Sequence, residues 1–449
     1  MRIPSTTARA LSLLAVLLPA STPVLAQTRD AEIEALREQI RQLDQKLRVL
    51  ERRQELKDEE TAARSKSAAS LSAGPSGFSL TSVDKAFQLR LRALVQGDAR
   101  FYLNDVVPNN DTFLFRRVRP TVEGTVFGKF GFRVTPEFAG SSSSLIDAYA
   151  TYQHSPAFNV LVGKSKTPFD LERLVSGGSL LFLERTYPTS LAGNRDIGVQ
   201  LYGDLLDGRL SYQLGWLNGV PDGGSSTSDS EDDKDLVARL FAYPFKGSDG
   251  PLSGLGFGIA ASTTSRRTGA PSGYRTNAQQ TFLSWRNGVV HAGDHTRIEP
   301  QFTFYSGPFG LLGSWISSRK ELAAGNAIRE IDDTAWFLAA SYVLTGEDAT
   351  IRGVTPSRNF SWADGTWGAF EIAARYAELD VDDAAFPTFA DPTISASKVS
   401  SWTLGANWYL NRAIKASLNY EYSDFEGGGG SAVTSRDEHA ILSRIQLNY

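Results

Sequence analysis

Cysteine is missing altogether from the 449 residues of this chain, and methionine occurs only once. Without cysteine the chain can form no disulfide, no thiolate metal site and no cysteine nucleophile, and it cannot carry the lipidated cysteine of a bacterial lipoprotein. A strong charge of one sign is also missing, because the formal net charge is only -4. This balance gives no compositional support for nucleic-acid binding. We therefore predict neither a nucleic-acid partner nor a cofactor.

Long hydrophobic runs are scarce as well, since none reaches the roughly 20 apolar residues of a transmembrane helix. The longest, Ala10 to Leu18, follows Arg2 and Arg9 and precedes the small-residue sequence Val24-Leu25-Ala26. This order is typical of a cleaved export signal, so residues 1–26 are predicted to be a signal peptide. A buried helix is the alternative, and two prolines in the segment disfavour it.

A helical pattern follows from residue 30 to about residue 60. Apolar residues recur there at alternating steps of three and four: Ile33, Leu36, Ile40, Leu43, Leu47 and Leu50. This spacing is a heptad seam, and its mixture of Ile and Leu is compatible with a trimer. We predict an α-helical coiled coil over residues 27–64, in the periplasm, and a Ser/Ala/Gly-rich linker over residues 65–85. A single amphipathic helix packed on its own domain is the alternative.

From about residue 86 to the C-terminus, apolar and polar residues alternate with the period of two that marks β-strands. Arg117, Arg119 and Glu123 fall on one face of such a strand, and Val118 and Val122 fall on the other. A soluble sandwich would turn the apolar face inward, whereas a membrane barrel would turn it toward lipid. Aromatic residues at strand ends, and short turns that alternate with long polar loops, favour the barrel.

The predicted fold is therefore an all-β transmembrane barrel over residues 86–449, preceded by the helical coiled coil. About 16 antiparallel strands of about 10 residues fit the length of this region, and 14 or 18 strands fit almost as well. Its outer face would contact membrane lipid. Tyr449 provides a terminal aromatic residue on the lipid face.

Basic residues are placed unevenly along this barrel. Acidic residues gather in predicted loops, whereas arginines lie on the polar faces of strands: Arg117, Arg119, Arg133, Arg239, Arg297, Arg375 and Arg444. Guanidinium groups along a wet channel replace the hydration of an anion with charge-assisted hydrogen bonds. The pattern predicts an anion-favouring lumen with small inorganic anions as its solutes. The alternative is an ordinary polar lumen, partly neutralised by Glu123, Glu137, Glu299 and Glu371.

Several ordered segments resemble the phosphate-selective porin family, which includes porins O and P. They are NDTFLFRRVRPTVEGTVFGKF at 110–130, GKSKTPFDLERL at 163–174, ERTYPTSLAGNRDIGVQLYG at 184–203, SYVLTGE at 341–347 and WGAFEIAARY at 367–376. The resemblance implies a homotrimer of 16-stranded barrels in the outer membrane of a Gram-negative bacterium. It also implies a channel for phosphate or polyphosphate.

The same resemblance implies that a loop within residues 163–195 folds into the pore and narrows it. The implied constriction residues are Lys164, Lys166, Arg185 and Asp170, and Arg117 and Arg119 match pore arginines of the family. Two positions depart from the family pattern, because Ser165 replaces a usual Phe and Asp170 a usual Gly. A carboxylate at the constriction would weaken anion binding.

Three other functions are compatible with the same pattern. They are a nonspecific porin, a structural tether that grips the cell wall through the coiled coil, and an outer-membrane lipase-like enzyme. The chain has no nucleophile-elbow motif. His291 and His295 would form a metal pair only on a helix, and Gly293 lies between them in a strand-like segment. We predict a channel without catalytic or metal-binding residues.

Overall fold

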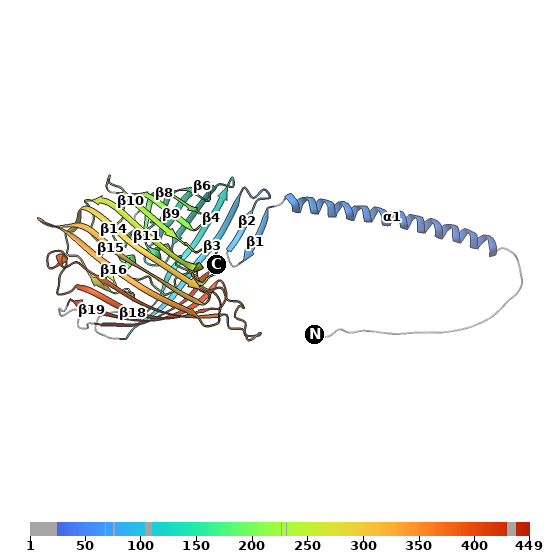
Figure 1. The fold of residues 1–449 in the computed structure, drawn as a ribbon. Coiled ribbons are helices and arrows are strands. Elements are labelled where there is room, and N and C mark those ends of the chain that lie inside the picture. Colours follow the sequence, from blue (N-terminus) through green and yellow to red (C-terminus); the bar gives the residue numbers. More distant parts are fainter. Residues whose placement is uncertain are drawn as a thin grey trace. The chain divides into compact units, whose positions relative to one another are not determined.

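The computed structural model describes residues 25–67, 69–74, 77–103, 110–225, 227–229, 231–428 and 437–449. The chain divides into a helical unit that ends at Ala68 and a β unit, Ala69–Tyr449 (Figure 1). Residues 1–24, most of the predicted signal peptide, lie outside the described residues.

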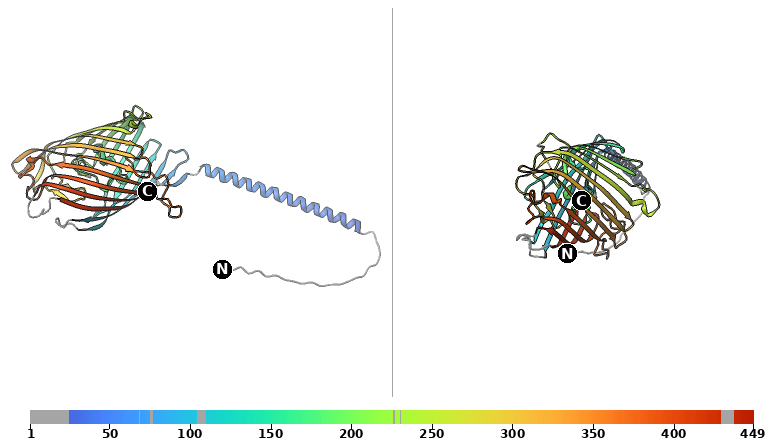
Figure 2. Two further views of the ribbon diagram at one scale, coloured as in Figure 1. Left: turned by 60° about the horizontal axis from the view of Figure 1, so that its bottom comes forward. Right: turned by 60° about the vertical axis from the view of Figure 1, so that its left-hand side comes forward.

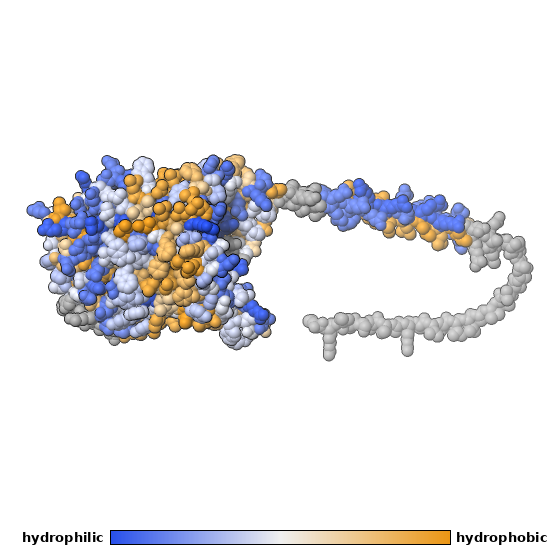
Figure 3. Space-filling view, in the orientation of Figure 1, coloured by the Kyte–Doolittle hydropathy of each residue, from blue (hydrophilic) through white to orange (hydrophobic). Residues whose placement is uncertain are grey.

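The helical unit consists of the 43-residue helix α1, Leu25–Ser67. Its apolar heptad residues face solvent, with exposed fractions from 48% at Ile33 to 64% at Leu43. Figure 3 shows them as a hydrophobic stripe along one side of an otherwise hydrophilic helix. The predicted N-terminal helix is confirmed, and its assembly into a coiled coil stays a prediction.

The β unit is a closed antiparallel barrel of 16 strands, as predicted. The strands are β3 (Gln88–Tyr102), β4 (Thr112–Val126), β5 (Phe130–Glu137), β6 (Ser144–Ser155), β7 (Phe158–Lys166), β8 (Arg195–Leu205), β9 (Leu210–Leu217), β10 (Asp235–Ala242), β11 (Leu255–Arg266), β14 (Val289–Ser306), β15 (Phe309–Ala324), β16 (Ala327–Val343), β17 (Ala369–Asp380), β18 (Ala396–Tyr409), β19 (Ile414–Gly427) and β20 (Asp437–Asn448). Each pairs with the next, and β20 pairs with β3, which closes the wall. Figure 2 shows the strands inclined around it.

The two faces of the wall follow the alternation in the sequence. On β4, Phe113 and Phe115 point outward with 81% and 65% of their surface exposed, whereas Arg117 is only 2% exposed. Figure 3 shows a hydrophobic region over the middle of the barrel unit and hydrophilic residues toward its ends. An apolar outer band of this kind is what the hydrocarbon of a membrane requires of a barrel.

One irregularity in β4 changes which arginines face inward. Gln96 of β3 pairs with Arg117, but its neighbour Gly97 pairs with Phe115, so Arg116 is an extra residue in the strand. Such a bulge shifts the side-chain alternation by one position. Arg116 and Arg117 therefore both turn toward the interior, although strict alternation places them on opposite faces.

The connections differ at the two ends of the barrel. At the end where the chain terminates, most turns are short, such as Gly307-Pro308 between β14 and β15. At the opposite end four connections are long, and they span residues 167–194, 218–234, 267–288 and 381–395. Short elements lie within them: α2 (Leu171–Leu174), α3 (Pro188–Leu191), β12 (Tyr274–Arg275), β13 (Thr281–Leu283) and the 3-10 turn η2 (Asp383–Ala385).

Thirteen residues of the predicted linker, 65–85, lie in a helix or strand, since residues 65–67 belong to α1 and ten others form two strands. Strands β1 (Ser70–Gly74) and β2 (Gly77–Thr81) form a hairpin there, and β2 pairs with the first residues of β3. Strand β20 pairs with β3 only from Leu94, and Tyr449 bonds Ala93, so the first residues of β3 have no partner in β20. The hairpin occupies this otherwise open edge. The segment between the helix and the first strand therefore contains only residues 68 and 69.

Apolar side chains fill one side of the barrel interior. Residues of the loop 167–194, among them Phe169, Leu171, Phe182 and Leu191, pack against inward-facing residues of β15, β16, β17 and β18. This cluster holds the loop against the wall and leaves the interior beside β3 to β8 polar. No helix in the described part of the chain is both long and apolar enough to span a membrane.

Candidate functional site in the barrel interior

The loop 167–194 crosses the barrel interior, where side chains of the wall donate hydrogen bonds to its backbone carbonyls. Six wall side chains each donate a hydrogen bond to one loop carbonyl: Gln96 to that of Gly177 (2.9 Å), Gln446 to Gly178 (2.7 Å), Lys415 to Leu180 (2.8 Å), Asn407 to Leu181 (2.8 Å), Arg444 to Leu183 (2.6 Å) and Arg375 to Glu184 (3.0 Å). A segment without regular structure must find partners for its buried carbonyls outside itself. These six bonds tie residues 177–184 to β3, β17, β18, β19 and β20.

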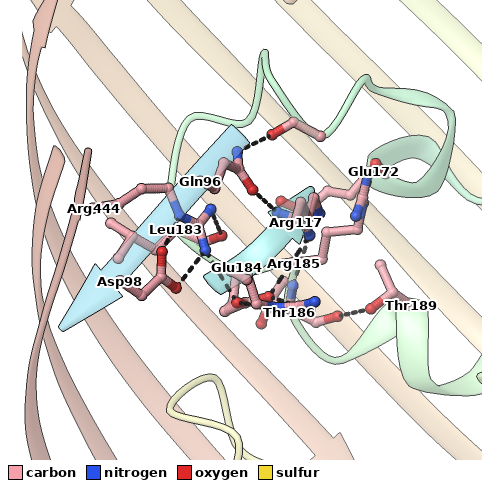
Figure 4. A network of polar contacts seen from close by, with 12 residues as sticks. Gln96, Asp98, Arg117, Glu172, Leu183, Glu184, Arg185, Thr186, Thr189 and Arg444 are labelled. Carbon is pink, nitrogen blue, oxygen red and sulfur yellow. Dashed lines mark hydrogen bonds and ion pairs between the residues drawn. The ribbon is translucent and has the colours of Figure 1, made fainter. Parts of the chain in front are cut away.

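Glu184 joins the loop to a cluster of arginines (Figure 4). Its carboxylate accepts two hydrogen bonds from Arg116, at 2.6 and 3.0 Å, and further bonds from Arg100 at 3.1 Å and Arg444 at 3.2 Å. Burial opposes ionisation of this carboxyl, but the arginines outweigh it and hold its pKa well below the ordinary range. Glu184 therefore stays charged and fixes several arginines that line the interior.

A first cavity of about 370 Å³ lies among residues of the long loops. Its charged lining consists of Arg116, Arg173, Arg185, Arg275 and a single carboxylate, Glu184. Hydroxyl groups complete the lining, from Thr186, Thr189, Ser190, Ser272 and Thr276. The lining thus offers an anion both positive charge and hydrogen-bond donors.

A second cavity of about 350 Å³ is lined mainly by strands β3 to β8. Its basic residues are Arg92, Arg119, Arg133, Lys166 and Arg195, and Asp147 is its only acidic residue. Four of these cations have carboxylate partners. Arg119 bonds Glu137 at 2.5 Å, Arg133 bonds Glu123 at 2.9 Å, Arg195 bonds Asp147 at 2.9 Å, and Arg92 forms an ion pair with Glu123 at 3.7 Å. These carboxylates therefore neutralise part of the positive charge that the cavity lining carries.

The carbonyl of Val175 marks the boundary between the two cavities. It accepts hydrogen bonds from Lys166 at 2.9 Å and from Arg185 at 2.8 Å. Lys166 lines the second cavity, whereas Arg185 lines the first. The shared acceptor is a neutral carbonyl, so no carboxylate neutralises either side chain at this contact. The interior thus presents positive charge to both cavities at the place where they approach each other.

The predicted lumen arginines do not all reach these cavities. Arg119 and Arg133 do, whereas Arg117 lies buried beneath the loop and donates to Gln96 at 2.6 Å. Arg297 is buried against Asp222 at 2.8 Å. Arg375 bonds the carbonyl of Glu184 and lies over the ring of Phe182 at 4.4 Å.

Two further predicted residues also lie away from the cavities. Arg239 donates to Gln301 at 3.0 Å. Lys164 is buried and lines neither cavity. Arg117, Arg239, Arg297 and Arg375 each contact wall or loop groups and are placed to support the fold of the interior.

Asp170 lies within the loop as expected, but its carboxylate is fully buried and lines neither cavity. It caps helix α2 by accepting from the Arg173 backbone at 2.5 Å, and it also contacts Glu299 of the wall. Burial raises the pKa of Asp170 above its ordinary value. Asp170 thus belongs to the loop but does not line either cavity, and its effect on anion binding stays a prediction.

Sequence reasoning missed several of the residues that line the cavities. The bulge shifts the alternation of side chains, so the pattern does not place Arg116 on the inner face. Arg173, Arg195 and Arg275 lie in or beside long connections, where apolar and polar residues do not alternate regularly. The signal available for Arg116 was the RRVRP motif itself, which carries two adjacent arginines.

His291 and His295 stack with ring centroids 5.7 Å apart. Within the described ranges no group of three His, Cys, Asp or Glu side chains is placed to hold a metal ion.

A closed barrel with an apolar outer band and a charged interior crossed by a loop defines a porin of the outer membrane. The chain belongs to the family described as phosphate-selective porin O and P, whose model matches residues 87–449. The predicted family and the location in a Gram-negative outer membrane are thereby confirmed. Members of this family are channel proteins, which supports a channel role for the chain.

Two known proteins illustrate the similarity. Porin O of Pseudomonas aeruginosa is 23% identical over an alignment of 390 positions that covers 77% of this chain and 84% of the relative. The outer membrane channel DcaP of Acinetobacter baumannii has a similar fold, with a TM-score of 0.53 and 13% identity over 81% of this chain and 98% of that one.

Proposed function

We propose that this porin is an anion-favouring diffusion channel, with phosphate or polyphosphate as its preferred solutes, narrowed by the loop 167–194. The observation that carries the proposal is the position of Lys166 and Arg185 at the Val175 carbonyl, between two cavities lined mostly by basic groups. The similarity to porin O and the description of the family support phosphate as the solute.

The physical basis is the placement of fixed positive charge in a narrow space with low-dielectric walls. Such a space concentrates anions and repels cations. An anion that leaves bulk water exchanges its hydration for charge-assisted hydrogen bonds with guanidinium and hydroxyl groups. Conduction also requires that each site be weak enough to release the anion. The carboxylates behind Arg119, Arg133 and Arg195 reduce the local charge and so favour release.

The proposal is tested by removing two charges that face the second cavity. The double variant Lys166→Met and Arg119→Met keeps most of the side-chain volume but leaves Glu137 without its cation. We expect the anion-to-cation permeability ratio to fall several-fold, measured as the reversal potential of single channels in a gradient of dilute potassium chloride, where screening is weakest. A channel that keeps its ratio after this change is a nonspecific porin.

Arg319→Met is the matched control. Arg319 is 54% exposed and pairs with Asp332 at 2.9 Å on β15 and β16. It lines neither cavity. Loss of its charge should therefore leave the reversal potential unchanged. Addition of phosphate to the chloride bath should reduce the chloride current of the wild type and reduce it less in the double variant.

A further inference from the structure

Three of the four long connections meet at one buried group of polar and charged side chains. Its centre is Lys320 of β15, which is 1% exposed and lines neither cavity. The Lys320 ammonium donates to Asp222 of the loop 218–234 at 3.0 Å and to the hydroxyl of Tyr274 in β12 at 2.8 Å. It also donates to Asp333 of β16 at 2.6 Å, which accepts from the backbone of Asp382, in the connection 381–395, at 3.0 Å. One lysine thus joins two loops to the wall, and the third loop binds the same carboxylate.

Charge as well as hydrogen bonding holds this group together. An ammonium has three donors, and all three have acceptors here, while the Tyr274 hydroxyl donates in turn to Asp333 at 2.6 Å. Burial would raise the pKa of Asp222, but Lys320 and the other basic neighbours outweigh it and hold that pKa well below the ordinary range. Asp222 therefore stays ionised, and separating it from Lys320 would break a buried ion pair. Its neighbour Gly223 lines the first cavity.

Tyr274 is likewise followed by a residue of the first cavity. Successive side chains of a strand point to opposite faces, and in β12 Tyr274 is 1% exposed, whereas Arg275 is exposed and lines the cavity. The guanidinium of Arg275 has no hydrogen-bond or ion-pair partner among the described residues. The other arginines of this lining, Arg116, Arg173 and Arg185, donate to acceptors of the protein. Arg275 therefore keeps every donor of its guanidinium for an anion.

The position of Arg275 depends on loop contacts, because β12 and β13 form a two-stranded sheet apart from the barrel wall. Such a hairpin is marginally stable by itself. On β13, Phe282 and Leu283 pack into the apolar cluster of the interior. On β12, the hydroxyl of Tyr274 bonds Lys320. Apolar packing has no preferred direction, whereas hydrogen bonds do, so the bonds of Tyr274 decide where β12 lies.

We propose that Lys320 is a positioning residue of the channel, which acts through Tyr274 and Asp222 on two loops that line the first cavity. The latch, formed by these three residues and Asp333, holds β12 so that Arg275 meets an anion in this cavity. No residue of the latch contacts the anion itself. The inference rests on the proposed anion channel and adds to it the residues that keep the first cavity in shape.

The first test compares the latch with the arginine that it positions. Tyr274→Phe keeps the ring but removes the hydroxyl, and Arg275→Met removes the charge. The phosphate concentration that halves the chloride current of single channels should rise several-fold for Arg275→Met and by a smaller factor for Tyr274→Phe. The double variant should match Arg275→Met alone, because residues that act through one another are not additive. If either single variant keeps the wild-type concentration, or if the two factors multiply in the double variant, the proposal is overturned.

Tyr376→Phe is the matched control for the loss of a hydroxyl. The Tyr376 hydroxyl also bonds a carboxylate, that of Glu378, but neither residue lines a cavity. This variant should therefore need the same phosphate concentration as the wild type.

The second test measures the position of β12 without any anion. The chain has no cysteine, so Arg275→Cys and Ser190→Cys introduce the only two thiols, and both positions line the first cavity. With a spin label on each thiol, pulsed electron paramagnetic resonance should give a narrow distance distribution. The distribution should broaden or shift when Tyr274→Phe or Lys320→Met is added. Tyr274→Phe leaves every charge in place, so the test does not depend on how well Lys320→Met folds.

Lys398→Met is the control for the loss of a lysine. Lys398 pairs with Glu378 at 3.6 Å and lines neither cavity, so its loss should leave the spin-label distances unchanged. Distances that stay the same in both latch variants overturn the latch, even where phosphate blocks the wild type. A wild type that phosphate does not block contradicts the proposed solute instead, and the distances still decide whether the latch positions β12.

Discussion

The two sides of the barrel interior have opposite character, although both are built from the same alternating strands. Beside β3 to β8 the inward residues are mostly charged or polar, and they surround the second cavity. Beside β15 to β18 many inward residues are apolar, such as Ile316, Ile331, Phe337 and Leu379, and the loops cover them. The period of two decides which residues share a face. The chemistry of the inward face decides whether that side is filled or stays open.

The difference assigns separate tasks to the two sides. The filled side anchors the loop by burial of apolar surface, which depends little on salt or pH. The polar side presents charge to the channel, and its residues need hydration or ion partners to remain there. Substitutions should therefore affect stability on the filled side and ion preference on the polar side. The one expected exception is Glu184, which belongs to both.

Glu184→Gln should have the largest effect. The change leaves Arg100, Arg116 and Arg444 without their shared charge in a buried place, and the loss of one partner from a buried ion cluster costs about 3–5 kcal/mol. We expect a lower urea midpoint of unfolding together with an altered permeability ratio. Glu330→Gln is the control, because Glu330 is 60% exposed and pairs with Arg319 at 3.6 Å. An exposed pair of this kind contributes about 1 kcal/mol at most.

Ile316→Ala should separate the two tasks. Ile316 is fully buried on the filled side, and truncation of such a residue to alanine costs about 2–5 kcal/mol through lost burial and the cavity that remains. The urea midpoint should fall while the reversal potential stays at the wild-type value. Thr121→Ala on the polar side, which removes a hydrogen bond to Thr135, should cost about 1 kcal/mol. A shift in ion preference for Ile316→Ala would break the division between the two sides.

Asp170→Asn should have the smallest effect, and one that depends on pH. Burial raises the pKa of Asp170, so the folded protein holds this proton more tightly than the unfolded chain. The resulting stability is present below the ordinary pKa of Asp and is lost as the pH rises through the raised value. Asn cannot ionise, so the variant should gain stability relative to the wild type as the pH increases. Thermal unfolding across this pH range measures the difference, and Asp249→Asn in an exposed turn is the control.

Much of the fold follows from local patterns in the chain. The heptad spacing from Ile33 to Leu50 is enough to predict helix α1, because a helix repeats every 3.6 residues and such a stripe has no place in a strand. The alternation around Val118 and Glu123 is enough to predict a strand and its two faces. The number of strands was less certain, since the lengths of the loops allowed several values.

The arrangement of the interior follows from contacts between distant residues. Residues 65–85 looked like a linker, yet ten of them pair as a hairpin because β20 ends before the start of β3. Arg116 turns inward because of a bulge, which no period in the sequence reveals. The resemblance to the family pointed to Lys166 and Arg185, but it also implied pore positions for Lys164 and Asp170, which are buried away from both cavities.

The chain alone thus determined the helix, the strands, the apolar outer face and the excess of arginine on the inner face, because each depends on the spacing of neighbouring residues. The tertiary structure decided which arginines support the fold and which line the cavities. Arg117 and Arg119 are two residues apart on the same face, but the loop at Gly177 covers the first and leaves the second in the second cavity. That distinction depends on the position of a loop about 60 residues further along the chain. The spacing of neighbouring residues does not predict such a contact between distant segments.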